Sequence, residues 1–202
     1  MTAGYNIENR GSAITAGTAS LTAGNNIENT AVAATQERNI VNGKNISNKE
    51  QITQYGSLIS VEEDLTARAG NNFQTTGSHV EAGNNIDIRV GNDIIADAAE
   101  NEYHMSGSSR KVNAKTDIVE QQGSSIVAGN DMVLGANNDI RLEASVAAAG
   151  NEDYLYAGRD INIESKDNEY YDYYQKTKTN NGFLSSSSKR TTEETYQTIA
   201  VG

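Results

Sequence analysis

Apolar and polar residues alternate along most of this chain, in short runs separated by Gly-Asn pairs. Residues 86–90 read Ile-Asp-Ile-Arg-Val, and residues 140–142 and 161–163 alternate in the same manner. A period of two residues is typical of β-strands, and glycine and asparagine adopt the backbone angles that tight corners need. The pattern therefore predicts short strands joined by corners, with every second side chain pointing into a narrow core.

One signature, Gly-x-(Asn/Asp)-(Ile/Phe), recurs along the chain. The apolar residues that close it are Ile7, Ile27, Ile46, Phe73, Ile94 and Ile161, and a looser version closes at Ile140. Most successive gaps are 19 to 21 residues, and two are longer, at 27 and 46 residues. A period of about 20 residues is typical of solenoids, in which each coil covers its neighbour's apolar face. Because parallel crossovers are almost always right-handed, the sequence predicts an all-β, right-handed parallel β-helix.

A second mark, a Gly-Ser pair, runs in phase with the signature and opens a strand in each coil. The glycines of these pairs are Gly11, Gly56, Gly77 and Gly123. Helical repeats would instead need helical runs of about 10 residues or more, and the sequence contains none. We therefore expect one β-helix over residues 1–202, with strands throughout.

The longest gap and the C-terminal end each hold a polar insertion. Both insertions carry Asn-Glu-Tyr, with Tyr103 and Tyr170 each nine residues after a signature isoleucine. A stretch with Gly and Ser follows, then a Thr-rich return, which predicts a long antiparallel hairpin. We expect two hairpins, at residues 97–120 and 164–198, leaving the same corner of the coil. Residues 31–60 depart from the pattern and predict a shorter insertion or an irregular coil.

The second insertion contains the run "YYDYYQKTKT". Tyrosines in such a run bind a carbohydrate or a protein partner, or they form cross-strand pairs that simply stabilise a sheet. Both interpretations stay open from the sequence. The residues that we expect to contribute to an interaction surface are Tyr103, Tyr170, Tyr171, Tyr173, Tyr174 and Phe183.

Composition narrows the choice of function. The formal net charge is −11, which disfavours a nucleic-acid partner. The chain has no cysteine, so disulfides and thiol catalysis are excluded. No apolar run approaches the roughly 18 residues of a membrane-spanning helix. The opening "MTAGYNIENR" already lies inside the repeat, so we expect an internal segment of a longer protein.

Candidate catalytic chemistry is sparse. The two histidines, His79 and His104, are too few for a zinc site, so no metal or cofactor is expected. Asp93, Asp139 and Asp160 occupy the signature position that asparagine fills elsewhere. Paired carboxylates on a β-helix can cleave polysaccharides, but the interchange of Asp with Asn favours a turn role, in which the side chain caps backbone amides. We therefore expect no enzymatic activity.

Three stretches carry a family resemblance: "AGNDMVL", "AGRDINIES" and "KTKTNNGFLSSSSKRTTEETYQTIAVG". With them the chain resembles the haemagglutinin repeats of filamentous haemagglutinin and of the long exoproteins of contact-dependent growth inhibition. The resemblance covers nearly the whole chain. The final block is more specific than the short units, which many two-partner-secreted exoproteins share.

The resemblance implies a segment of a filament that an outer-membrane partner transporter secretes to the bacterial cell surface. It also implies that this region helps to deliver a C-terminal toxin into a neighbouring bacterium, with target-cell surface or outer-membrane components as partners. Two alternatives stay open: an adhesin that binds host or cell-surface glycans, and a polysaccharide-cleaving β-helix. An uncapped solenoid segment also exposes its end coils, so we expect some end-to-end self-association.

Overall fold

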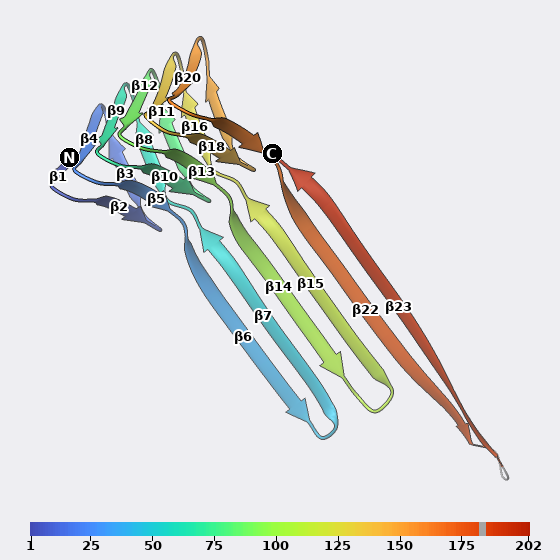
Figure 1. The fold of residues 1–202 in the computed structure, drawn as a ribbon. Helices are drawn as coiled ribbons and strands as arrows, with labels where there is room; N and C mark the ends of the chain where they lie inside the picture. The colour runs from blue at the N-terminus through green and yellow to red at the C-terminus, as the bar shows by residue number, and fades with distance from the viewer. Residues whose placement is uncertain (182–184) are drawn as a thin grey trace.

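A parallel β-helix forms one end of the molecule, and long hairpins project from its side (Figure 1). The computed structural model describes residues 1–181 and 185–202. Three of its sheets are parallel, and each grows by one strand per coil. The predicted parallel β-helix is therefore confirmed. The described residues include no helix with the length and apolar content needed to cross a membrane.

Each of the first five coils contributes one strand to each of three parallel sheets, and the last coil contributes to the first two. The first sheet contains β1 (Thr2–Ala3), β4 (Ala19–Ala23), β9 (Leu65–Ala69), β12 (Ile86–Val90), β17 (Met132–Ala136) and β20 (Asp153–Ala157). The second contains β2 (Ile7–Arg10), β5 (Ile27–Thr30), β10 (Phe73–Thr76), β13 (Ile94–Asp97), β18 (Ile140–Glu143) and β21 (Ile161–Glu164). The third contains β3 (Ala13–Ala16), β8 (Leu58–Val61), β11 (His79–Ala82), β16 (Ser125–Ala128) and β19 (Val146–Ala149).

The signature residues form a stack inside the second sheet. Register places the following residues opposite one another in successive coils: Ile7, Ile27, Phe73, Ile94, Ile140 and Ile161. The four middle members are at most 1% exposed, and burying a side chain of this size contributes about 1.5–3 kcal/mol. In β21, by contrast, Ile161 and Ile163 are 46% and 68% exposed. This open apolar end is what end-to-end association would need, and that association stays a prediction.

Hydrogen-bonded ladders run along the corners of the coil. Ahead of the second sheet, five Asn or Asp residues of the signature each accept two bonds from the next coil: Asn6, Asn26, Asn72, Asp93 and Asp139. The Oδ1 atom of Asp93, for example, accepts from Asn138 Nδ2 at 2.7 Å and from the Asp139 backbone amide at 3.1 Å. At the Gly-Ser corner, the Ser145 hydroxyl accepts from the Ser124 amide at 3.0 Å. The turn role predicted for the signature carboxylates is confirmed for Asp93 and Asp139, whereas the Asp160 side chain caps no backbone amide in the described residues.

The hairpins number three in the described residues, one more than the sequence analysis expected. They consist of β6 (Val32–Asn42) with β7 (Asn45–Tyr55), β14 (Ala99–Ser108) with β15 (Val112–Gln122), and β22 (Lys166–Asn181) with β23 (Ser186–Val201). Each lies after a strand of the second sheet, and the first two return the chain to the third sheet. The assignment of Ile46 to the coil was wrong. Its "NGKNI" motif is the turn of the first hairpin, where Gly43 has a φ of 61°.

All three hairpins belong to one antiparallel sheet of order β23-β22-β15-β14-β7-β6, which we call the hairpin sheet (Figure 1). The hairpins begin at Val32, Ala99 and Lys166, so they follow one another at intervals of 67 residues, or two coils and a hairpin. Strands in both kinds of sheet are about 4.8 Å apart. Two coils therefore advance the chain by about the width of one two-stranded hairpin. This match lets the hairpins pair edge to edge without gaps.

Candidate interaction surface on the hairpins

The hairpin sheet divides the predicted aromatic surface into two. We call residues that lie directly opposite one another across the six strands a row. The pairing continues without a bulge from the row that contains Thr35 and Glu102 to the hairpin turns. Residues of one row therefore share a face of the sheet. Tyr103, Tyr170 and Tyr174 lie on one face, which we call the tyrosine face. Tyr171 and Tyr173 lie on the opposite face, which we call the acidic face. Phe183 lies outside the described residues.

The tyrosine face is aromatic and cationic. Ile118 lies directly between Tyr103 and Tyr170, so a row of large apolar side chains crosses from the second hairpin to the third. Lys49 of the first hairpin places Nζ 5.0 Å from the centre of the Tyr103 ring, a cation–π distance. Tyr170 is 37% exposed. From the Thr35 row outward this face carries five basic residues and two acidic ones: Arg38, Lys49, Lys176, Lys178 and Lys189, against Asp172 and Glu193.

The acidic face carries more acidic than basic residues. Over the same rows it carries six acidic residues and two basic ones: Glu37, Glu50, Glu102, Asp117, Glu169 and Glu194, against Lys115 and Arg190. Tyr171 donates a hydrogen bond of 3.0 Å to Glu194, and this bond raises the pKa of the tyrosine. The two faces of a single-layered sheet therefore differ in sign of charge, and both face solvent.

His104 lies at the centre of the acidic face. Its Nε2 atom is 2.9 Å from Glu102, and its Nδ1 atom is 2.9 Å from Asp117 of the neighbouring strand. Hydrogen bonds to Glu102 and then Asp117 raise the pKa of His104. Lys115 also pairs with Asp117. His79 lies on β11 of the third parallel sheet, where its Nδ1 atom is 2.7 Å from the Ser125 hydroxyl, so the two histidines form no common site.

The Asn-Glu-Tyr motif marks the joint between successive hairpins. Asn101 and Asn168 each place Oδ1 2.7 Å from a backbone amide of the preceding hairpin, at Gln54 and Gln121 respectively. The side chains of the two glutamines in turn donate to the backbone carbonyls of Glu100 and Asp167. Each joint thus replaces a strand-to-strand bond at the base of the sheet. The positions of the first hairpin that are equivalent to this motif, residues 34–36, are Ala-Thr-Gln. They lie on β6, which has no neighbour on its outer side in the described residues.

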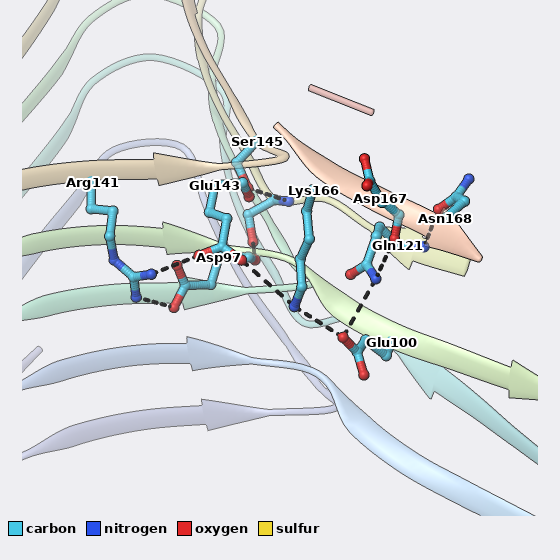
Figure 2. Close-up of polar contacts among 10 residues, drawn as sticks. Asp97, Glu100, Gln121, Arg141, Glu143, Ser145, Lys166, Asp167 and Asn168 are labelled. Carbon is cyan, nitrogen blue, oxygen red and sulfur yellow. Dashed lines mark hydrogen bonds and ion pairs between the residues drawn. The ribbon is translucent and has the colours of Figure 1, made fainter. Parts of the chain in front are cut away.

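A cluster of charges ties the third hairpin to the β-helix (Figure 2). Arg141 contacts Asp97 and Glu143, each at 2.7 Å, and Lys166 contacts Glu100 at 3.0 Å and Glu143 at 3.6 Å. Burial raises the pKa of Asp97, whereas the Lys166 ammonium lowers the pKa of Glu100. Each ion here is partly exposed, so the pairs position the chain more than they stabilise it. The cluster holds the base of β22 against β14 and β18.

The described residues bear on two kinds of reaction centre, a metal site and a catalytic carboxylate pair. They contain no group of three or more His, Cys, Asp or Glu side chains arranged to hold a metal ion. Of the two carboxylates that a polysaccharide-cleaving enzyme would need as a pair, Asp139 belongs to the corner ladder, whereas the Asp160 carboxylate lies 3.5 Å from Arg159 Nε. The Oδ1 atom of Asp139 accepts from Arg159 Nε at 2.9 Å and from the Asp160 amide at 3.1 Å.

The family model described as "Hemagglutinin repeat" matches residues 39–118 and 105–200. The two matches start 66 residues apart, close to the interval between hairpins, and together they cover most of the chain. The chain belongs to the hemagglutinin repeat family. As a member it is a segment of a secreted filamentous exoprotein of the bacterial cell surface.

Three relatives are similar to this chain. It is 31% identical over 110 residues to "16S rRNA endonuclease CdiA" of Enterobacter cloacae subsp. cloacae, covering 54% of this chain and 3% of the relative. It is 27% identical over 146 residues to "Deoxyribonuclease CdiA" of Dickeya dadantii, covering 72% and 4%. It is 29% identical over 113 residues to "tRNA nuclease CdiA" of Escherichia coli, covering 55% and 3%. The chain thus spans a few per cent of these relatives' length. No solved structure matches it.

The sequence analysis missed several residues of the two faces. Lys49 and Ile118 lie beside Tyr103 on the tyrosine face, and Glu50 lies opposite His104 on the acidic face. The missing information was the pairing between hairpins. The available signal was the 67-residue interval from Ile27 to Ile94 and on to Ile161, which was hidden when Ile46 was counted as a coil residue.

Proposed function

We propose that this segment is a rigid, non-catalytic part of a toxin-delivering exoprotein of the contact-dependent growth inhibition type. Its three relatives are named for different targets, namely 16S rRNA, DNA and tRNA. A region similar in all three serves a step that they have in common rather than the choice of nucleic acid. Delivery of the toxin into a neighbouring bacterium is such a step.

The hairpin sheet is the part that we assign to contact with the target cell. It projects from the β-helix with both faces in solvent, and segments that project from a rigid scaffold usually carry binding (Figure 1). The row Tyr103, Ile118 and Tyr170 supplies contact area at low entropic cost. The partners are surface or outer-membrane components of the target cell. Export of the parent protein would use an outer-membrane partner transporter.

The test is made in the parent protein, by removing residues 169–198 and joining the ends with a short turn. We expect normal display on the producing cell, weaker attachment to susceptible cells and weaker growth inhibition in competition. A sharper variant changes Tyr103, Tyr170 and Tyr174 to Ser. Its matched control changes Tyr154 and Tyr156 to Ser, because these side chains are 61% and 56% exposed on the β-helix itself. Unchanged attachment and inhibition after both hairpin changes would reject this function.

An adhesin is the second candidate, favoured by the partly exposed Tyr103 beside Lys49, since an aromatic ring next to a cation suits stacking on a sugar. Glycan binding by the isolated chain that disappears with the triple tyrosine change, together with unchanged toxin entry, would support adhesion instead. A polysaccharide-cleaving activity is the third candidate. It would require cleavage of acidic glycans that is lost when Asp139 and Asp160 are changed to Asn.

A further inference from the structure

The tips of the three hairpins concentrate positive charge in an acidic protein. The tips comprise residues 41–46, 108–113, 175–181 and 185–192, which lie beyond the row that pairs Tyr174 with Glu193. They contain seven basic residues and no Asp or Glu: Lys44, Arg110, Lys111, Lys176, Lys178, Lys189 and Arg190. The remaining chain has 9 basic and 27 acidic residues, a net charge of −18. The molecule is therefore polarised, with a basic end on an acidic body.

The seven side chains are available to a ligand. All are exposed, and none forms an ion pair within residues 1–181 and 185–202. Lys44 of the first tip, with Arg110 and Lys111 of the second, lines one open hollow between the two hairpins. The hollow has no carboxylate in its wall. Three cations that line one hollow without an anion suit a phosphate group.

The tips are also far from the carboxylates of the β-helix. The nearest tip lies about nine residues along β6 from the β-helix, or roughly 30 Å at the rise of a strand. Charges in water are screened over about 8 Å at physiological ionic strength, so the carboxylates of the β-helix do not cancel the field of the tips, whereas Glu193 and Glu194 of the hairpin sheet lie beside the third tip. Neighbouring hairpins are two strands apart, or roughly 10 Å, so the tips present a line of spaced cations.

An apolar pair accompanies the cations. Val41 and Ile46 lie directly opposite one another at the end of the first hairpin and are 67% and 41% exposed. Exposed aliphatic side chains next to lysine suit the boundary between headgroups and acyl chains in a lipid layer. Duplex nucleic acid offers phosphates but no such apolar layer. The combination therefore favours a lipid surface.

We propose that the hairpin tips form a docking site for an anionic lipid surface, with Lys44, Arg110 and Lys111 binding one phosphate-bearing headgroup. The cations of the third tip bind neighbouring headgroups, and Val41 and Ile46 contact the acyl boundary. This inference deepens the proposed function, because it names the chemistry of the surface that the hairpins meet. The tips would hold the sheet upright, with the acidic β-helix kept away from the surface.

The test measures binding of the whole chain to vesicles of equal parts phosphatidylglycerol and phosphatidylcholine, and to vesicles of phosphatidylcholine alone. The tip variant carries Lys44→Gln, Lys111→Gln and Lys178→Gln, one change per hairpin. The control carries Arg10→Gln, Arg89→Gln and Arg159→Gln, three exposed cations of the β-helix. Melting curves check that both variants are folded.

We expect binding only to the anionic vesicles, weakened at least about tenfold in the tip variant and unchanged in the control. High salt should also weaken binding of the unchanged chain to the anionic vesicles. Equal binding to both vesicles, or an equal loss in the control, would overturn the proposal. Duplex DNA that binds as tightly as the anionic vesicles would overturn the assignment to lipid. If the chain does not bind anionic vesicles, the deletion of residues 169–198 can still weaken growth inhibition. The lipid proposal and the proposed function can therefore fail independently of each other.

Discussion

Thr116 of the second hairpin donates a hydrogen bond of 2.8 Å to Asp172 of the third hairpin. The two residues are 56 positions apart in the chain and lie directly opposite in the hairpin sheet. Contacts of this kind make the insertions one structure rather than three separate loops. The β-helix fixes the spacing of the hairpins, and the hairpins in turn tie together coils that are two turns apart.

This matched spacing predicts which deletions the fold tolerates. Removing residues 56–122 takes out one whole 67-residue repeat and joins Tyr55 to Gly123, the residue equivalent to Gly56. The remaining two hairpins should pair, and the protein should melt in one cooperative transition. Removing residues 73–93 takes out a single coil and leaves the first two hairpins about 5 Å apart, half the width that a hairpin needs. We expect this protein to melt at a lower temperature, and an equal melting temperature for the two deletions would contradict the spacing argument.

Ala144 is the one non-glycine residue with positive φ among the described residues, at 44°. It follows a strand of the second sheet, as Gly11 and Gly77 do, and those glycines have φ of 56° and 54°. Because a Cβ atom disfavours this region, Ala144→Gly should raise the free energy of unfolding by up to about 1 kcal/mol. Gly77→Ala should lower it by about 2 kcal/mol or more, since its Cβ would lie 2.5 Å from the Ala99 Cβ. Urea denaturation measures both, and a destabilised Ala144→Gly would refute the strain.

The joint between hairpins predicts a matched pair of substitutions. Asn168→Ala leaves the backbone amide of Gln121 without its 2.7 Å acceptor, which should cost about 1–3 kcal/mol. Asn168→Asp keeps an acceptor oxygen at the same position and should cost less. Thermal melting measures the difference, and hydrogen exchange at Gln121 locates it. Equal losses in the two variants would show that the side chain acts by packing and not as an acceptor.

His104 should make the stability of the hairpin sheet depend on pH. Glu102 and Asp117 raise its pKa, and Glu50 lies directly opposite it. A group whose folded pKa is raised contributes stability that is fully present below its ordinary value of 6.5 and is lost as the pH rises through the folded pKa. The melting temperature should therefore fall over this interval, and His104→Gln should remove that fall. An identical pH profile in the variant would exclude the mechanism.

Much of the β-helix could be predicted because its chemistry is local. The alternation of apolar and polar residues identifies the side chains that point inward. A Gly-Asn pair indicates a corner of the coil where it follows a strand of four or five residues. The same pair in "NGKNI" is a hairpin turn, because Asn-Gly also suits two-residue β-hairpin loops. Local sequence does not separate these uses. The separation comes from the length of the flanking strands, since β6 and β7 each run for 11 residues.

The interaction surface was less predictable, because its neighbours are distant in the chain. Alternation along β22 already separates Tyr170 and Tyr174 from Tyr171 and Tyr173. It does not reveal that Lys49 lies over Tyr103, because that contact depends on how β7 pairs with β14. The charge of the tips is likewise invisible in the total of −11, since it emerges only when three hairpin ends are placed side by side.

Pairing between hairpins is the central claim, and the absence of native cysteine allows a direct test. Asn48 and Ser106 lie directly opposite on β7 and β14, with Nδ2 and Oγ 3.5 Å apart. The variant Asn48→Cys with Ser106→Cys should form an intramolecular disulfide under mild oxidation. The control is Asn48→Cys with Asn113→Cys, two positions that lie two strands apart and two residues apart along the strands. Their separation exceeds the roughly 10 Å of two strand spacings, which is too far for a disulfide. Rapid cross-linking of the first pair alone is the result that we predict, and equal or absent cross-linking in both would contradict the continuous hairpin sheet.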